Sequence, residues 1–134
     1  MRVLALDYGA ARCGVALSDP TGTLASPLDA VVRPGSPDGL AEIARLVQER
    51  EVGAVVVGLP LTLAGDESAQ TAEARAFAAR LGDAVAPVPV ELYDERLTTA
   101  QARRTGGSAD EDSRAAAHLL EAWLARGEAP RGGG

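Results

Sequence analysis

The sequence predicts an α/β domain in which a mixed five-stranded sheet carries helices on both faces. Three short strand-like segments come first, and the first two are joined by a turn over residues 8–12. Further along, apolar runs without polar alternation are separated by segments whose apolar residues recur at helical spacing. Early strands in a meander, followed by alternating helices and strands, indicate a sheet with both antiparallel and parallel neighbours.

The predicted elements follow one another without an internal repeat or an interdomain linker. Residues 3–7 and 14–18 are expected to pair as a hairpin, and residues 28–32 to add a third strand. Ser36 and Pro37 supply an N-cap and a first-position proline for the first helix. The later predicted elements are a buried strand over residues 53–59, a helix capped by Asp66 or Ser68 and reaching about Leu81, a strand from Val88, a short helix capped at Thr98, and a last helix ending near Arg126.

The length of the chain limits the number of domains. A chain of 134 residues can bury one core of ordinary size, so we expect one domain over residues 1–127 and a flexible tail over residues 128–134. The single cysteine, Cys13, cannot form an internal disulfide, no apolar run is long enough to span a bilayer, and the N-terminus lacks the layout of a signal peptide. These features predict a cytoplasmic protein without a membrane partner.

The formal net charge of -6 argues against a protein that coats nucleic acid nonspecifically, because such binding needs a basic surface. All 13 basic residues are arginines, whose planar guanidinium suits bidentate contacts to phosphate. G/C-rich coding also explains the absence of lysine, and we give that explanation more weight than phosphate binding. Four arginines nevertheless lie in one stretch and would form a local basic rim: Arg96, Arg103, Arg104 and Arg114.

Three acidic residues, Asp7, Glu95 and Asp112, stand where the predicted fold would bring them towards one edge of the sheet. Asp7 ends the apolar run Val3–Leu6, which predicts a central strand. Ligands in open α/β sheets bind outside the carboxyl ends of the strands, where an unpaired buried carboxylate would be costly. We therefore expect a cation to meet Asp7.

Two neighbouring acids, Asp94 and Glu95, close the fifth predicted strand, and only one of them can face this site. Period-two alternation groups Asp94 with Val90 and Leu92, and Glu95 with Tyr93 on the other face. The pattern leaves the choice open, because a strand often twists or ends before its last polar residues.

Asp112 opens the last predicted helix, one turn before Ala116 on the apolar face, so we expect its side chain to point at the sheet. Residues 108–111 fit a capping box, which places Asp112 near a helix N-terminus, where negative charge is favoured. Carboxylate oxygens are preferred by Mg²⁺ and Mn²⁺, which usually keep waters and substrate phosphates in their shells. The three acids therefore predict a divalent-metal site.

Four motifs in order along the chain resemble those of the YqgF (RuvX) family. They are residues 6–16, residues 57–60 with Gly65, residues 94–99 and residues 112–116, and together they span nearly the whole sequence. The resemblance implies a ribonuclease H-like fold, related to that of the Holliday junction resolvase RuvC. It also implies a nuclease, because 5′-end maturation of precursor 16S rRNA and junction resolution are both proposed for the family.

Carried over residue by residue, the resemblance implies that Asp7, Glu95 and Asp112 bind Mg²⁺ or Mn²⁺ and act in catalysis, with Asp94 beside them in the same motif. Relatives with this fold commonly carry an acid on the fourth strand, whereas residues 58–60 are Gly-Leu-Pro and the acid follows on the fifth strand. Basic residues that often precede the last acid are also few here. The candidates for nucleic-acid contact are therefore Arg12, Arg96, Arg103 and Arg104, with Gly9, Gly58 and Gly65 allowing close approach of a phosphate backbone.

The predicted reaction is hydrolysis of phosphodiester bonds, assisted by one or two divalent ions. The resemblance implies structured or precursor RNA as the substrate, with branched DNA as the alternative. A junction resolvase would act as a symmetric homodimer on two strands. No residue identifies a reader of the ribose 2′-hydroxyl, so the sequence leaves RNA and DNA open.

Two other classes of function compete with the nuclease. A noncatalytic nucleic-acid-binding module is disfavoured, because all three acids are present. The run Asp7-Tyr8-Gly9 also resembles the phosphate loop of the sugar kinase and actin group. That architecture needs two lobes, for which this chain is too short.

Overall fold

The computed structural model describes residues 1–61, 64–94 and 109–126. Its elements, in chain order, are β1 (Arg2–Asp7), β2 (Arg12–Ser18), β3 (Ala25–Val32), α1 (Pro37–Glu49), β4 (Val52–Leu59), α2 (Ala69–Val85), β5 (Val90–Asp94) and α4 (Ala109–Arg126). The short helix predicted after Thr98 and the predicted tail lie outside these ranges. No helix within them is long and apolar enough to cross a bilayer.

The five strands form one mixed sheet in the order β3-β2-β1-β4-β5. β1, β4 and β5 are parallel, whereas β2 pairs antiparallel with both β1 and β3. The carboxyl ends of the three parallel strands therefore meet at one edge of the sheet. The predicted meander, and the parallel strands that follow it through helical crossovers, are confirmed.

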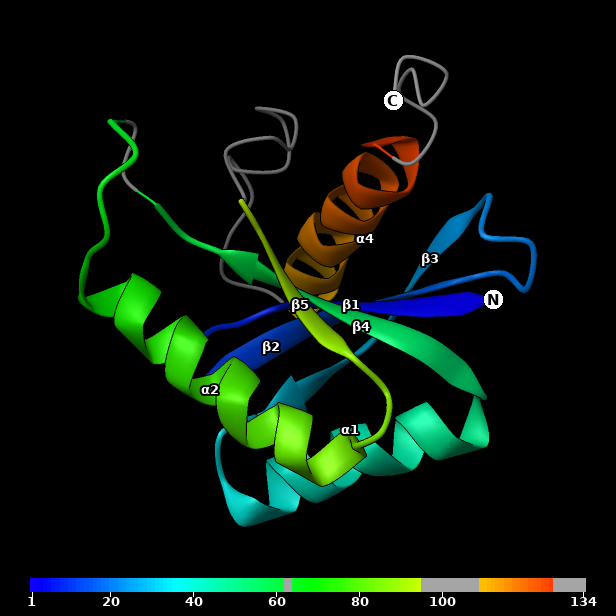
Figure 1. The fold of residues 1–134 in the computed structure, drawn as a ribbon, viewed down its shortest axis with the longest axis horizontal. Helices are drawn as coiled ribbons and strands as arrows, with labels where there is room; N and C mark the ends of the chain where they lie inside the picture. The colour runs from blue at the N-terminus through cyan, green and yellow to red at the C-terminus, as the bar shows by residue number, and fades with distance from the viewer. Residues whose placement is uncertain (62–63, 95–108, 127–134) are drawn as a thin grey trace.

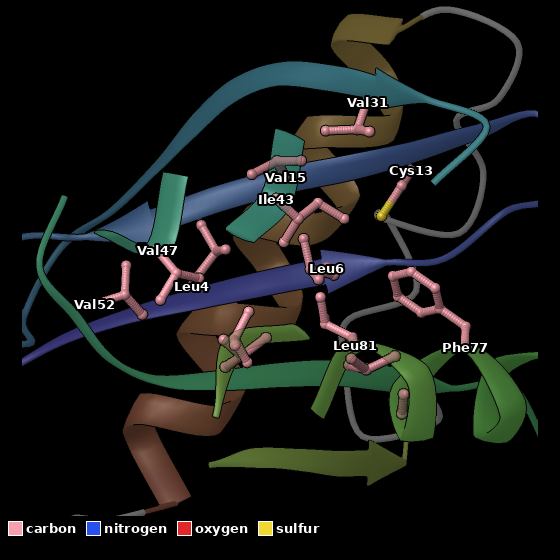
Figure 2. Packing of buried hydrophobic residues seen from close by; sticks show 14 of the residues in the cluster. Leu4, Leu6, Cys13, Val15, Val31, Ile43, Val47, Val52, Phe77 and Leu81 are labelled. Atoms are coloured by element: carbon pink, nitrogen blue, oxygen red, sulfur yellow. The ribbon is translucent and has the colours of Figure 1, made fainter. Parts of the chain in front are cut away.

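Helices cover both faces of the sheet, α1 and α2 on one side and α4 on the other (Figure 1). β1 shows why: Leu4 and Leu6 join the cluster under α1 and α2, while Val3 and Ala5 join the cluster under α4. Figure 2 shows side chains of β1, β2, α1 and α2 meeting in the larger cluster. A strand that is apolar on both faces explains the lack of polar alternation in the sequence.

The second helix differs from its prediction at the carboxyl end. Ser68 is its N-cap, which resolves the choice between Asp66 and Ser68. The helix continues past Leu81 to Val85, because Val85 follows one turn later and is also buried in the core. Pro87 then follows the helix, a position at which the missing N–H of proline does no harm.

The fifth strand differs from its prediction at the amino end, which was placed at Val88. β5 begins at Val90, lies at the edge of the sheet, and all of its residues keep some exposure. The carbonyl of Pro89 still accepts the N–H of Val55, but Pro89 has no N–H to give to the ladder. The edge position also leaves the side chain of Glu91 exposed to solvent.

Two serine hydroxyls satisfy backbone groups where the sheet register shifts. The N–H of Val3 donates to Oγ of the buried Ser18 at 2.8 Å, next to a shift in the β1–β4 pairing. The N–H of Val15 donates to Oγ of the buried Ser113 at 3.2 Å, next to a shift in the β2–β3 pairing. Because Ser113 belongs to α4, the second bond fastens this helix to β2.

The start of α2 is fastened to the end of β4. The buried Thr71 accepts the N–H of Ser68 at 3.0 Å in a capping box and donates its hydroxyl proton to the carbonyl of Pro60. Further along α2, the buried ring of Phe77 stacks on Tyr8, the residue after β1, with ring centroids 4.6 Å apart. Both contacts hold α2 against the strand ends.

Replacing Thr71 with Val should lower the free energy of unfolding by about 1–3 kcal/mol, because the Pro60 carbonyl and the Ser68 N–H lose their partner. Urea unfolding followed by circular dichroism measures this change. The control is Thr23→Val at an exposed position, where a change of at most about 0.5 kcal/mol is expected. Equal losses in both variants would show that the Thr71 hydroxyl has no special role.

Candidate active site

Asp7 and Asp112 meet across one glycine of the sheet. Asp7 ends β1, and alternation after Val3 and Ala5 places it on the α4 face. Its partner in the β1–β2 register is Gly14. A Cβ atom at Gly14 would overlap the backbone carbonyl of Asp112, which lies in the first turn of α4. The structure therefore places both predicted site residues next to Gly14.

Gly14 permits this arrangement because it has no side chain. The atoms that a Cβ would strike are all backbone atoms, of Asp112 and Ser113, so no side-chain rotation could relieve the clash. Gly14 was not among the site residues predicted from the sequence. The available signal was a glycine within a strand, which often marks close approach of another backbone.

Arg12 forms an ion pair with Asp112. Arg12 Nε donates to Asp112 Oδ2 at 3.0 Å, and the two residues lie 100 positions apart in the chain. The side chains are 39% and 27% exposed, respectively, so water screens the pair in part. Arg12, which was predicted to contact nucleic acid, therefore lies beside one of the predicted metal ligands.

The thiol of Cys13 lies within the electrostatic reach of both acids. Burial raises the pKa of this thiol well above its ordinary value of 9.0, and the negative charges of Asp7 and Asp112 raise it further. Cys13 is fully buried in the core cluster and is therefore a neutral, structural residue.

A cavity of about 250 Å³ opens at the strand ends beside Asp7. Its walls are the turn after β1, Pro60 at the end of β4, and two residues from the first turns of α2, Gln70 and Glu73. Gln70 and Glu73 were not predicted from the sequence, because both are exposed helix residues that reach the cavity only when Thr71 binds the start of α2 to Pro60. The cavity gives a ligand a path to the end of β1.

The remaining predicted acids are partly described. Asp94 ends β5 opposite Leu59, and alternation after Leu92 places it on the face covered by α1 and α2, away from α4. Glu95 lies outside the described residues. So do three of the predicted nucleic-acid contacts: Arg96, Arg103 and Arg104.

The three predicted glycine contacts occupy different settings. A Cβ atom at Gly9 would lie 2.6 Å from the carbonyl oxygen of Arg12, so the turn itself requires glycine there. Gly65 has a φ of 91°, a conformation that favours glycine. Gly58 lies inside β4, buried and paired with Tyr93, so strands rather than an open surface surround it.

The donor chemistry of this site fits a hard divalent cation. Asp7 and Asp112 offer carboxylate oxygens, and Mg²⁺ commonly binds through one or two carboxylates together with waters and substrate phosphates. Within residues 1–61, 64–94 and 109–126, no group of three or more His, Cys, Asp or Glu side chains is placed to hold a metal ion. The third predicted ligand, Glu95, is not among those residues.

Fold and site together define a class of protein, a ribonuclease H-like α/β domain with carboxylates gathered at the end of β1 and the start of α4. A solved structure described as Thermus thermophilus RuvC in complex with Holliday junction substrate is similar to it, with a TM-score of 0.60. The match covers 96% of this chain and 97% of that chain at 18% identity, so it concerns the fold.

The family described as RuvX, Holliday junction resolvase, matches residues 1–126, and the chain belongs to this family. A protein of Anaeromyxobacter sp. (strain Fw109-5) is 47% identical over 133 residues, which cover 92% of this chain and 96% of that protein. A protein of Thermobifida fusca (strain YX) is 52% identical over 108 residues, which cover 78% and 67%, respectively. Both are named "Putative pre-16S rRNA nuclease". The motif resemblance is confirmed, and these relatives support a nuclease.

Replacing Gly14 with Ala should lower the free energy of unfolding by about 1–3 kcal/mol, because the new methyl group must push the start of α4 away from β2. Urea unfolding monitored by the fluorescence of Trp123, which packs beside the α4 cluster, measures the change. Gly82→Ala is the matched control. Nothing lies within 4 Å of its added Cβ, and alanine within α2 should stabilise by about 0.5–1 kcal/mol. Unchanged stability of the Gly14 variant would contradict the close contact.

The raised pKa of Cys13 predicts a loss of stability at alkaline pH. Above the ordinary thiol pKa of 9.0, the unfolded chain loses this proton while the folded chain keeps it. The free energy of unfolding should therefore fall with rising pH by up to about 1.4 kcal/mol per pH unit. Urea unfolding between about pH 7.5 and 10 should show this slope in the wild type and a shallower one in Cys13→Ala. Parallel curves would contradict the assignment.

Proposed function

We propose that this protein is a divalent-metal-dependent nuclease that hydrolyses phosphodiester bonds in structured or precursor RNA, such as the 5′ end of precursor 16S rRNA. The observation that carries the proposal is the meeting of Asp7 and Asp112 at Gly14. Two carboxylates gathered from remote parts of the chain repel each other, and a shared divalent cation would relieve that repulsion. A single buried cysteine also fits the reducing cytoplasm, where we place the protein.

The third ligand in this proposal is Glu95 rather than Asp94. Tyr93 packs against the α4 cluster, while Leu92 packs against the opposite cluster. Continued alternation would bring Asp94 to the side of Leu92 and Glu95 to the side of Tyr93, which is also the side of Asp112. These roles agree with the motif resemblance, which implies Glu95 as a metal ligand and Asp94 as the residue beside it.

A bound Mg²⁺ or Mn²⁺ would supply the positive charge that stabilises an in-line displacement at phosphorus. The chain's own residues have other tasks. Asp7 and Asp112 would hold the ion at the sheet edge, and the cavity bounded by Pro60, Gln70 and Glu73 would admit the substrate to the end of β1. Because Glu73 and the net charge of -6 both repel phosphate, substrate binding should depend strongly on the cation.

The relatives favour RNA as the substrate. Proteins that are 41% to 52% identical, including those of Anaeromyxobacter and Thermobifida, carry a name that refers to precursor 16S rRNA. The family description refers instead to the Holliday junction, which favours four-way DNA as the second candidate. Cleavage of a junction would require a symmetric homodimer that presents two sites, whereas cleavage of RNA would not.

Replacing Asp7 with Asn should reduce cleavage by about 100-fold or more, since loss of even an outer partner of a metal ligand costs about 10- to 100-fold. The side chain keeps its size but loses the charge that binds the ion. The assay compares a precursor 16S rRNA fragment, single-stranded RNA and a four-way DNA junction, each with Mg²⁺, with Mn²⁺ and with a chelator. We expect metal-dependent cleavage of the precursor fragment.

The control variant is Asp83→Asn, which removes an equal charge from an exposed position on α2 and should leave cleavage unchanged. Full activity of the Asp7 variant would contradict the assigned site. Cleavage of the four-way DNA alone would favour the resolvase. A wild-type protein that binds these nucleic acids but cleaves none of them, with either metal, would favour the noncatalytic module.

A further inference from the structure

One cation is already present where the candidate metal site lies. The guanidinium of Arg12 donates to Asp112 Oδ2 at 3.0 Å, at the point where Asp112 and Asp7 approach Gly14. Arg12 is the first residue of β2, and alternation places it with Gly14 on the α4 face. An oxygen that a divalent ion would use is thus engaged by an internal positive charge.

Docking of α4 does not depend on this ion pair. The helix is fastened to β2 by the buried hydroxyl of Ser113, which accepts the N–H of Val15, and by the fully buried Ala116 and Leu120. An ion pair whose partners are both partly exposed adds little to stability. A role in electrostatics at the site explains the position of Arg12 better than a role in holding the helix.

Two cations at one carboxylate also compete. A divalent ion at Asp112 would repel the nearby guanidinium, and it would take the lone pairs that Arg12 Nε–H now uses. Arginine cannot lose its proton to avoid this repulsion, so movement of its side chain is the response open to it. The displaced guanidinium would then be available to a substrate phosphate, which its planar shape suits.

We propose that Arg12 is a resident counter-cation of the metal site, which neutralises Asp112 in the metal-free protein and is displaced from that carboxylate when a divalent ion binds. This inference rests on the proposed function, because it requires a metal at Asp7 and Asp112. It assigns Arg12 a positioning role that precedes any contact with nucleic acid. It also makes metal binding and the Arg12–Asp112 contact mutually exclusive at Asp112 Oδ2.

The test is calorimetric titration of the whole protein with Mn²⁺ alone. Arg12→Gln should bind Mn²⁺ about two- to fivefold more tightly than the wild type, the range expected when a partly exposed ion pair no longer competes. The matched control is Arg45→Gln, which removes an arginine from the exposed Arg45–Glu49 pair on α1 and should leave Mn²⁺ affinity unchanged.

The outcomes separate this inference from the proposed function. Wild-type protein that binds Mn²⁺ while Arg12→Gln binds it equally or more weakly would overturn the role of Arg12 and leave the nuclease proposal standing. Weaker Mn²⁺ binding by Arg12→Gln would be the result if the ion pair served to orient Asp112 for the metal. Wild-type protein that binds no Mn²⁺ would overturn both proposals.

Nuclear magnetic resonance gives a second measurement that does not need the Gln variant to fold. The Nε–H resonance of Arg12 in ¹⁵N-labelled wild-type protein can be assigned by its absence in Arg12→Lys. Saturating Mg²⁺ should move this resonance in the direction that Asp112→Ala moves it without metal, because both take the carboxylate acceptor away from Arg12 Nε–H. A resonance that saturating Mg²⁺ leaves in place would overturn the proposal.

Discussion

The contact between two backbones at Gly14 is the constraint on which the site depends. α4 can bring Asp112 to the sheet because β2 has no side chain at the point of contact. The same contact sets the depth of Ser113, whose hydroxyl then reaches the Val15 N–H. It also sets the reach of Arg12 to Asp112. The glycine contact, the hydrogen bond and the ion pair together fix α4, near the end of the chain, against β2, near its start.

Gathering carboxylates at that contact opposes folding unless positive charge is also present. Burial raises the pKa of the Cys13 thiol, and the charges of Asp7 and Asp112 raise it further, so both carboxylates lie near this thiol. Arg12 offsets part of this charge from within the chain. A site that is compensated only in part, in a protein with a net charge of -6, is well suited to attract a cation before it meets a polyanion.

Apolar patterns in the sequence were sufficient to predict the sheet, its helices and the positions of Asp7 and Asp112. These features have local causes: Val3–Leu6 must lie in a doubly covered strand, and Asp7 must then stand at its carboxyl end. The edge position of β5 was missed, because a short apolar run has the same composition in the centre of a sheet and at its border. Burial depends on which strands become neighbours, and that is decided by tertiary packing.

The parts of the site that sequence could not reveal are contacts between remote backbones. Gly14 matters because the backbone of Asp112 packs directly against it. Gln70 and Glu73 reach the cavity because the Thr71 hydroxyl binds the Pro60 carbonyl. Such contacts leave no periodic trace in either segment, because each is set by the position of the other. Leu92 and Tyr93 pack on opposite faces of the sheet, which the sequence of β5 predicted by its alternation.

The docking of α4 against β2 has a consequence for the protein during its own synthesis. Translation makes Asp7 early and Asp112 late, so an unfinished polypeptide holds one carboxylate without the other. The Asp7–Asp112 site stays incomplete until the last helix has been made and has packed against Gly14. If these two residues hold the catalytic ion, as we propose, an unfinished chain cannot cleave the ribosomal RNA that surrounds it during translation.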